Sequence, residues 1–171
     1  HFQGADMPTI DPSLRPGKVT KWGEWVKSKP LVVNGAESRW RILGKYDLVS
    51  TNDDGTIGLI DCKVSDSPRD SGQFYSPQLE AYAFALENPA AGKTQSVASM
   101  GLLVWRPTTA IGSNADEYGF GVMQKYVPVE RDQANFIKVI GEFIEVLEGE
   151  LPDAGSECQT CTYLVARNAL N

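Results

Sequence analysis

One nine-residue segment, 56–64, constrains the fold of this chain more than any other. Side chains alternate across a strand, so one face would carry Ile57, Leu59, Asp61 and Lys63, and the other Ile60, Cys62 and Val64. Because both faces begin apolar, the segment is predicted to be a central strand covered on both sides. Further along the strand, Asp61 and Lys63 occupy positions where the apolar face would otherwise continue. Burying such charges is costly unless each has a partner, so a site that needs both charges explains their presence.

The segment before it, 39–50, is predicted to be a second, longer strand that joins the first through the turn at 52–55. A hairpin centred near residues 53 and 54 places Asp47 roughly opposite residues 60 to 61. Two convergent carboxylates repel each other unless a divalent cation lies between them, and oxygen ligands suit Mg²⁺ or Mn²⁺. Lys63 would orient or deprotonate an attacking water, or stabilise developing negative charge.

The remaining elements predict one α/β domain with a mixed sheet. Three more strands, two helices and a long helix are expected, and the long helix would bury one apolar face. In the first half of the chain the predictions are a loose lead-in over 5–20, a short helix over 22–29 and a strand over 31–33 with an Asn34-Gly35 turn. A helix is predicted from an N-cap at Ser76 to Glu87, with a start one turn earlier as the alternative. Strands over 97–105 and 118–127 follow, then a helix that buries Phe136, Ile140, Phe143, Ile144 and Leu147 and ends at Pro152, and a tail with Cys158 and Cys161.

Composition sets further bounds. A chain of 171 residues suits one domain, and no apolar run reaches the roughly 18 residues of a membrane span. Residues 1–4 read as a tag remnant, which leaves 5–171 as the domain and removes the only histidine from consideration. Three cysteines favour a reducing, cytoplasmic location. A net charge of −6 opposes broad nucleic-acid binding unless bound cations and a local basic patch compensate.

Three short motifs occur in an informative order. Gly44-Lys45-Tyr46-Asp47, then Asp61-Cys62-Lys63, then Gln78-Leu79-Glu80-Ala81-Tyr82 resemble the G-x-x-D, (D/E)-x-K and Q-x-x-x-Y series of RecB-like nucleases. These nucleases belong to the PD-(D/E)XK superfamily and include the AddB nuclease domain and the CRISPR-associated RecB-like exonucleases. The resemblance covers roughly residues 40–87, with a weaker echo in the Cys-x-x-Cys-x-Tyr tail at 158–163.

The resemblance implies a restriction-endonuclease-like fold, a mixed β-sheet flanked by helices, and metal-dependent hydrolysis of phosphodiester bonds in single- or double-stranded DNA, with exonuclease action expected of the RecB-like type. It implies that Asp47, Asp61 and the backbone carbonyl of Cys62 bind Mg²⁺ or Mn²⁺ and that Lys63 assists catalysis. Gln78 and Tyr82, one helical turn apart, would line the cleft and position Lys63 or the nucleic-acid backbone. Protein partners in recombination, repair or phage replication are also expected.

The sequence departs from the family pattern in two places. Many RecB-type members carry an upstream histidine as an additional metal ligand. Here Glu24 is the first candidate to replace it, and Glu37 the second. Many relatives also bind an iron–sulfur cluster through four cysteines. Since only Cys158 and Cys161 lie in the tail, no cluster is expected.

Each motif also has a plainer interpretation. Asp61 and Lys63 would be an exposed ion pair worth about 0–1 kcal/mol, Tyr82 a core aromatic and Gln78 a surface residue. Gly44 would reflect close packing or a bulge. The other plain interpretations are Glu24 as a solvated residue, Cys158 and Cys161 as packing residues, and a basic rim of Arg39, Arg41, Arg69 and Lys93 as scattered surface charge.

Two other functions stay open at this stage. The first is a nucleic-acid-binding or assembly module that keeps the fold without cleaving. The missing histidine and the acidic net charge favour it. The second is an unrelated α/β protein in which the three motifs occur together by accident.

Overall fold

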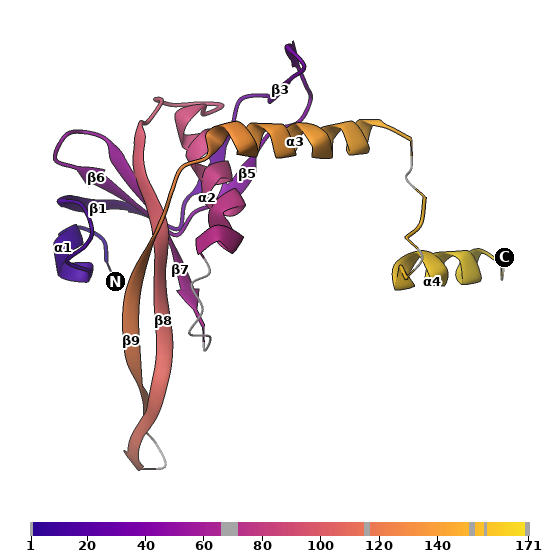
Figure 1. Ribbon diagram of the computed structural model, residues 1–171. Helices are drawn as coiled ribbons and strands as arrows, with labels where there is room; N and C mark the ends of the chain where they lie inside the picture. The colour runs from indigo at the N-terminus through magenta and orange to yellow at the C-terminus, as the bar shows by residue number, and fades with distance from the viewer. Residues whose placement is uncertain (1, 66–71, 115–116, 151–152, 156, 170–171) are drawn as a thin grey trace.

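The computed structural model describes residues 2–65, 72–114, 117–150, 153–155 and 157–169, and its core is a five-stranded sheet (Figure 1). The strand order is β1 (Gly17–Trp22), β6 (Leu48–Asn52), β7 (Ile57–Val64), β8 (Val97–Asn114), β9 (Glu117–Val129). Only β7 and β8 run parallel among these neighbours, and α2 (Gly72–Glu87) lies in the crossover between them. A mixed sheet flanked by helices is the predicted fold class, which is confirmed.

The central strand β7 is covered on both faces, as its sequence predicts. Leu59 is fully buried in a cluster with Leu79 of α2. Ile60 is buried in a second cluster on the opposite face, with Met7 of α1 (Met7–Ile10). Burying side chains of this size stabilises the fold by about 1.5–3 kcal/mol each. The two clusters therefore hold β7 in place from both sides.

The N-terminal predictions are wrong. Residues 5–20 are not a loose lead-in, because they contain α1 and most of β1. The predicted helix over 22–29 is instead the end of β1 followed by β2 (Trp25–Lys27), which pairs antiparallel with β5 (Leu43–Lys45). Gly23, at φ 61°, lies between β1 and β2 in the left-handed region that favours glycine.

The segment 39–50 is two strands rather than one. The chain forms β5 and then β6, with Tyr46 and Asp47 between them. β5 pairs with β2 in a separate small sheet, whereas β6 pairs with β1 and β7. The predicted strand and its turn at 34–35 are confirmed, with both turn residues in the left-handed region. The strand is β3 (Val32–Val33), and its partner, β4 (Ala36–Glu37), begins before the predicted strand over 39–50.

Three boundaries differ from the predictions. α2 begins at Gly72 and contains Pro77, which forgoes only one backbone hydrogen bond near the start of the helix. β8 and β9 continue past their predicted ends as a long antiparallel ribbon, which projects from the sheet in Figure 1. The ribbon replaces the predicted loop because each strand satisfies the backbone groups of the other, with a register shift after Pro107.

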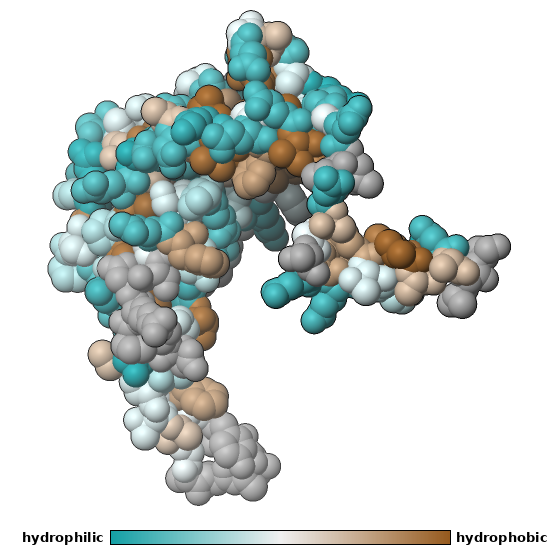
Figure 2. Space-filling view, turned by 45° about the vertical axis from the view of Figure 1, so that its right-hand side comes forward, coloured by the Kyte–Doolittle hydropathy of each residue, from teal (hydrophilic) through white to brown (hydrophobic). Residues whose placement is uncertain are grey.

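Helix α3 (Gln133–Glu148) confirms the predicted long helix but not its full burial. Phe136 and Ile144 are buried, while Phe143 and Leu147 are 60% and 58% exposed. Figure 2 shows hydrophobic surface along this helix. Asp132 caps its N-terminus by accepting a hydrogen bond from the Asn135 amide. Pro152, the predicted stop, lies outside the described residues.

The tail forms α4 (Gln159–Asn168), which lies away from the sheet in Figure 1. Within the described ranges, none of the helices combines the length and the apolar character needed to cross a membrane. At the other end of the chain, the Phe2 ring stacks on Trp105, with centroids 5.9 Å apart. The origin of residues 1–4 as a tag remnant stays a prediction.

Candidate active site

The β6–β7 hairpin brings two carboxylates together. Leu48 pairs with Ile60, so Asp47, one residue earlier, lies beside Asp61. One carboxylate oxygen of Asp47 (Oδ2) accepts a hydrogen bond of 2.7 Å from the Cys62 amide, which holds Asp47 against β7. The convergence expected from the turn is therefore present, although Asp47 belongs to the connection between β5 and β6 rather than to a strand.

Asp61 is only 3% exposed, and Lys63 lies next to it. The Lys63 Nζ is 2.6 Å from Asp61 Oδ2 and 4.4 Å from the centroid of the Tyr75 ring. The approach of Lys63 lacks the alignment of a hydrogen bond, so Oδ2 has no hydrogen-bond partner among the described residues. The pair is thus not the exposed surface pair of the plainer interpretation.

Helix α2 contributes the third side of the site. Gln78 accepts a hydrogen bond of 3.4 Å from Lys63 Nζ and donates from Nε2 to Asp61 Oδ1 at 3.2 Å. The same Nε2 donates to the Tyr82 hydroxyl at 3.0 Å. Gln78 therefore joins both charged groups of β7 to the helix, and it also lines a groove of about 550 Å³ between α2 and α3.

Gly44 is explained by close packing. A Cβ atom on Gly44 would lie 2.4 Å from Cε1 of Tyr82, much closer than real contacts allow. The Tyr82 ring thus fits over the backbone of β5 while its hydroxyl contacts Gln78. Tyr82 both packs against the first core cluster and belongs to the hydrogen-bond network of the site.

Burial dominates the electrostatics of the site. Desolvation raises the pKa of the Asp61 carboxyl, and the nearby charge of Asp47 raises it further, against the lowering effect of Lys63. Desolvation lowers the pKa of Lys63, but its close ion pair with the Asp61 carboxylate outweighs this effect, and the net direction is upward. Burial and both carboxylates raise the pKa of the Cys62 thiol to about 12. This thiol packs against the second core cluster, so the amide of Cys62, rather than its side chain, contacts the site.

The donor set fits a hard divalent cation in part. Two carboxylates adjoin, and among the described residues the buried Asp61 Oδ2 accepts no hydrogen bond and has only the Lys63 ammonium as a charge partner, so it can also ligate a cation. Glu24 does not join them: it is exposed, and its Oε2 accepts a hydrogen bond from the Tyr46 hydroxyl at 3.0 Å. In the part of the chain that the structure describes, no group of three His, Cys, Asp or Glu side chains is close enough to hold a metal.

The other sequence candidates are dispersed. Glu37 lies exposed in the β3–β4 hairpin. Cys158 accepts a hydrogen bond from the Cys161 amide at the start of α4, while Cys62 lies on the central strand. Of the expected basic rim, Arg39 pairs with Glu148, Arg41 donates to the Ser28 carbonyl, Lys93 lines a small pocket, and Arg69 lies outside the described residues.

Two features of the site were missed from the sequence. Tyr75, whose ring lies under Lys63, is three residues before Gln78 on the same helix face. The earlier of the two expected helix starts includes it, so this spacing was available from the sequence. The second is Arg131, which pairs with the buried Glu80 and with Glu87 and so fixes α2. A glutamate on a buried helix face signals a missing partner, but nothing in the sequence identifies a partner 51 residues away.

Comparison with known proteins gives one family. A family model described as the PD-(D/E)XK nuclease superfamily matches residues 12–166. No curated protein sequence matches the chain significantly. Among solved structures, one titled "Crystal structure of SSO0001" is similar at 18% identity and a TM-score of 0.47. The alignment covers 85% of this chain and 58% of that one, so this chain spans less than two thirds of that protein.

Proposed function

Because the chain belongs to the PD-(D/E)XK nuclease superfamily, we propose that it is a metal-dependent nuclease of RecB-like type that hydrolyses phosphodiester bonds in DNA, possessing exonuclease activity. The observation that supports this most is the convergence of Asp47, Asp61 and Lys63 with Gln78 of α2. The order of the three motifs along the chain supports the RecB-like type.

In this proposal Asp47, Asp61 and the Cys62 carbonyl hold Mg²⁺ or Mn²⁺. The cation, when bound, draws the phosphate and the attacking water together and offsets charge on the phosphorus centre. Glu24 would add a further ligand only by releasing the Tyr46 hydroxyl.

The protein's own groups orient the reaction. Lys63 is a donor in its contact with Gln78, and a donor here stabilises negative charge that develops on the phosphate oxygens. Gln78 holds both Lys63 and Asp61, so it fixes the distance between them. Tyr82 fixes Gln78 in turn.

The test is degradation of labelled single- and double-stranded DNA with Mg²⁺ or Mn²⁺. Activity is expected in the wild type, to be lost in Asp61→Ala and Lys63→Ala, and to be unchanged in Lys138→Ala, a control on α3 that is 74% exposed. Cleavage by both active-site variants at the wild-type rate would refute the proposal. An end-labelled and an internally labelled substrate distinguish exonuclease from endonuclease action.

A second candidate, a binding or assembly module without cleavage, is favoured because no third His, Cys, Asp or Glu side chain joins the two aspartates among the residues that the structure describes. Calorimetric titration with Mn²⁺ distinguishes the two. The nuclease predicts binding that is lost in Asp47→Asn and Asp61→Asn, with Glu24→Gln as a test of the upstream ligand. The module predicts no binding that depends on either aspartate.

A further inference from the structure

Positive charge is concentrated in one part of this acidic chain. Residues 12–46 hold eight of the 16 basic residues but only two of the 22 acidic ones, Glu24 and Glu37. The basic residues are Arg15, Lys18, Lys21, Lys27, Lys29, Arg39, Arg41 and Lys45. This part of the chain therefore differs in sign from the rest, which carries the whole of the net negative charge.

The small sheet of β2 and β5 presents part of this charge on an open face. Trp25 pairs with Lys45 and Lys27 pairs with Leu43, so these four side chains share one face. Trp25 is 69% and Leu43 is 64% exposed, and both lysines are exposed. On the opposite face, Val26 is buried in the core. We call the four residues the β2–β5 platform.

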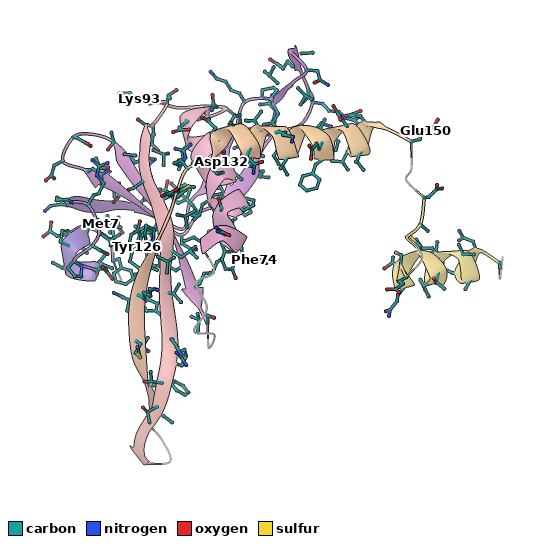
Figure 3. All side chains as sticks on the ribbon, viewed as in Figure 1. Met7, Phe74, Lys93, Tyr126, Asp132 and Glu150 are labelled. Carbon is teal, nitrogen blue, oxygen red and sulfur yellow. The ribbon has the colours of Figure 1, made fainter. Side chains whose placement is uncertain are left out.

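The two platform lysines, Lys27 and Lys45, differ from Lys18 of the same segment, which is ion-paired with Asp6. Neither platform lysine forms an ion pair with any residue that the structure describes, whereas Arg15 and Arg39 of the same segment are paired. Lys21 lines a pocket of about 190 Å³ with Trp25, Lys27 and Lys93, the last of which is labelled in Figure 3. Glu24 lies in the same pocket, where its carboxylate accepts the Tyr46 hydroxyl.

The platform is continuous with the candidate active site. Lys45 precedes Asp47 by two residues, so their Cα atoms lie at most about 7 Å apart. Gly44 of β5 lies on the face opposite to the platform side chains, against the ring of Tyr82. A nucleic-acid strand bound at Lys45 would therefore pass the end of β5 close to the backbone of Asp47.

We propose that the β2–β5 platform binds an unpaired strand of nucleic acid next to the site of cleavage. This inference rests on the proposed nuclease function and specifies its substrate. The open indole of Trp25 offers a π-face to an unpaired base, whereas the base faces of a duplex are already stacked. Lys27 and Lys45 lie beside it to neutralise phosphates, and the negative charge elsewhere on the chain disfavours binding at other faces.

The test is fluorescence anisotropy with a dye-labelled single strand of about 12 nucleotides and its blunt duplex, in EDTA. The wild type is expected to bind the single strand more tightly. Trp25→Ala is expected to weaken binding by about tenfold without changing its salt dependence. Lys27→Ala and Lys45→Ala are each expected to reduce the slope of log affinity against log salt by about 0.7. Phe120→Ala, 68% exposed on β9, and Lys138→Ala are the matched controls and are expected to match the wild type.

If Trp25→Ala, Lys27→Ala and Lys45→Ala all bind the single strand with wild-type affinity, the proposed role of the platform is wrong. So would binding of the wild type to phosphatidylserine vesicles through Trp25 without binding to the oligonucleotide, because the face would then contact a membrane surface. The outcome is separable from the proposed function. Loss of affinity in the platform variants of a protein that never cleaves DNA supports the platform alone, and Asp61-dependent cleavage that Trp25→Ala leaves unchanged supports the nuclease alone.

Discussion

Asp61 is a charged side chain that the fold shields from water, and its carboxylate is costly without a cation. Its pKa is raised mainly by desolvation, so the folded protein retains the proton of Asp61 to higher pH than the unfolded chain does. Stability linked to this group therefore falls as pH rises from the ordinary value of 3.8 through the raised value. The site thus gives up stability for a ligand position, as functional sites commonly do.

Asp61→Asn tests this cost directly. The asparagine keeps the shape of the side chain and can still accept from Gln78, but it removes the desolvated charge. In EDTA the variant is expected to melt at a higher temperature than the wild type at pH 7, with the difference shrinking toward pH 3. Thermal unfolding followed by circular dichroism across this range measures it. A variant that melts lower than the wild type at neutral pH would show that the Lys63 pair outweighs desolvation.

At the same scale, the sequence predicts the residues at the centre of the site well, but it predicts the position of the expected upstream ligand, Glu24, poorly. Alternation along one strand and the centre of one turn were sufficient to bring Asp47, Asp61 and Lys63 together, because both are local properties. Glu24 depends on how β2 packs against β5, which is a long-range property. The structure accordingly places it with Tyr46.

At the scale of elements, the fit of α2 against β5 determines where Gln78 lies. Gly44→Ala would insert a methyl group 2.4 Å from the Tyr82 ring and displace the helix face that carries Gln78. We expect a loss of about 1–3 kcal/mol in the free energy of unfolding, as in other overpacked sites, together with reduced nuclease activity. Urea unfolding and the DNA degradation assay measure the two effects.

The control for Gly44→Ala is Gly141→Ala on α3, where the nearest atom to the new Cβ is 4.0 Å away, in Val33. Replacing a helical glycine that has such space with alanine is expected to raise the free energy of unfolding by about 0.5–1 kcal/mol. The double variant Gly44→Ala/Tyr82→Leu should regain stability, because the clashing ring is gone. It should not regain activity, because the hydroxyl that contacts Gln78 is gone too. If Gly44→Ala alone is as stable and active as the wild type, the packing of Tyr82 does not position the site.

Which elements could be predicted follows from how local their signals are. β7 and α3 were found because their own periodicity defines them. β1 and β2 were missed because each exists through pairing with a distant strand, as in the pairing of Gly17 with Asn52. The extension of β8 and β9 pairs neighbouring segments, and it was missed because its Gly, Asn and Thr residues are typical of a loop. Trp22, Trp25 and Val26 also have a helix-like spacing, which misleads without the pairing partner.

At the scale of the whole molecule, one buried ion network connects the helices with the sheet. Arg131 donates to both oxygens of Glu80, to Glu87 and to the Val97 carbonyl of β8. The amide of Asp132, the residue labelled at the start of α3 in Figure 3, also donates to Glu80. Since Glu80 is 1% exposed, its charge depends entirely on these partners. The network fixes α2, and with it Gln78, relative to the sheet.

Removing Arg131 alone should therefore destabilise the fold far more than removing Arg131 together with the charge of its partner Glu80. Arg131→Met leaves Glu80 buried and uncompensated, and we expect a loss of about 3–5 kcal/mol in the free energy of unfolding. Arg131→Met with Glu80→Gln should recover much of this loss, because a neutral amide can still accept from Asp132. Arg39→Met, which breaks an exposed pair with Glu148, should cost about 0–1 kcal/mol. Urea unfolding of the wild type, the two single variants and the double variant tests this prediction. Equal losses in the free energy of unfolding in Arg131→Met and Arg39→Met would mean that α2 is held by its apolar face alone.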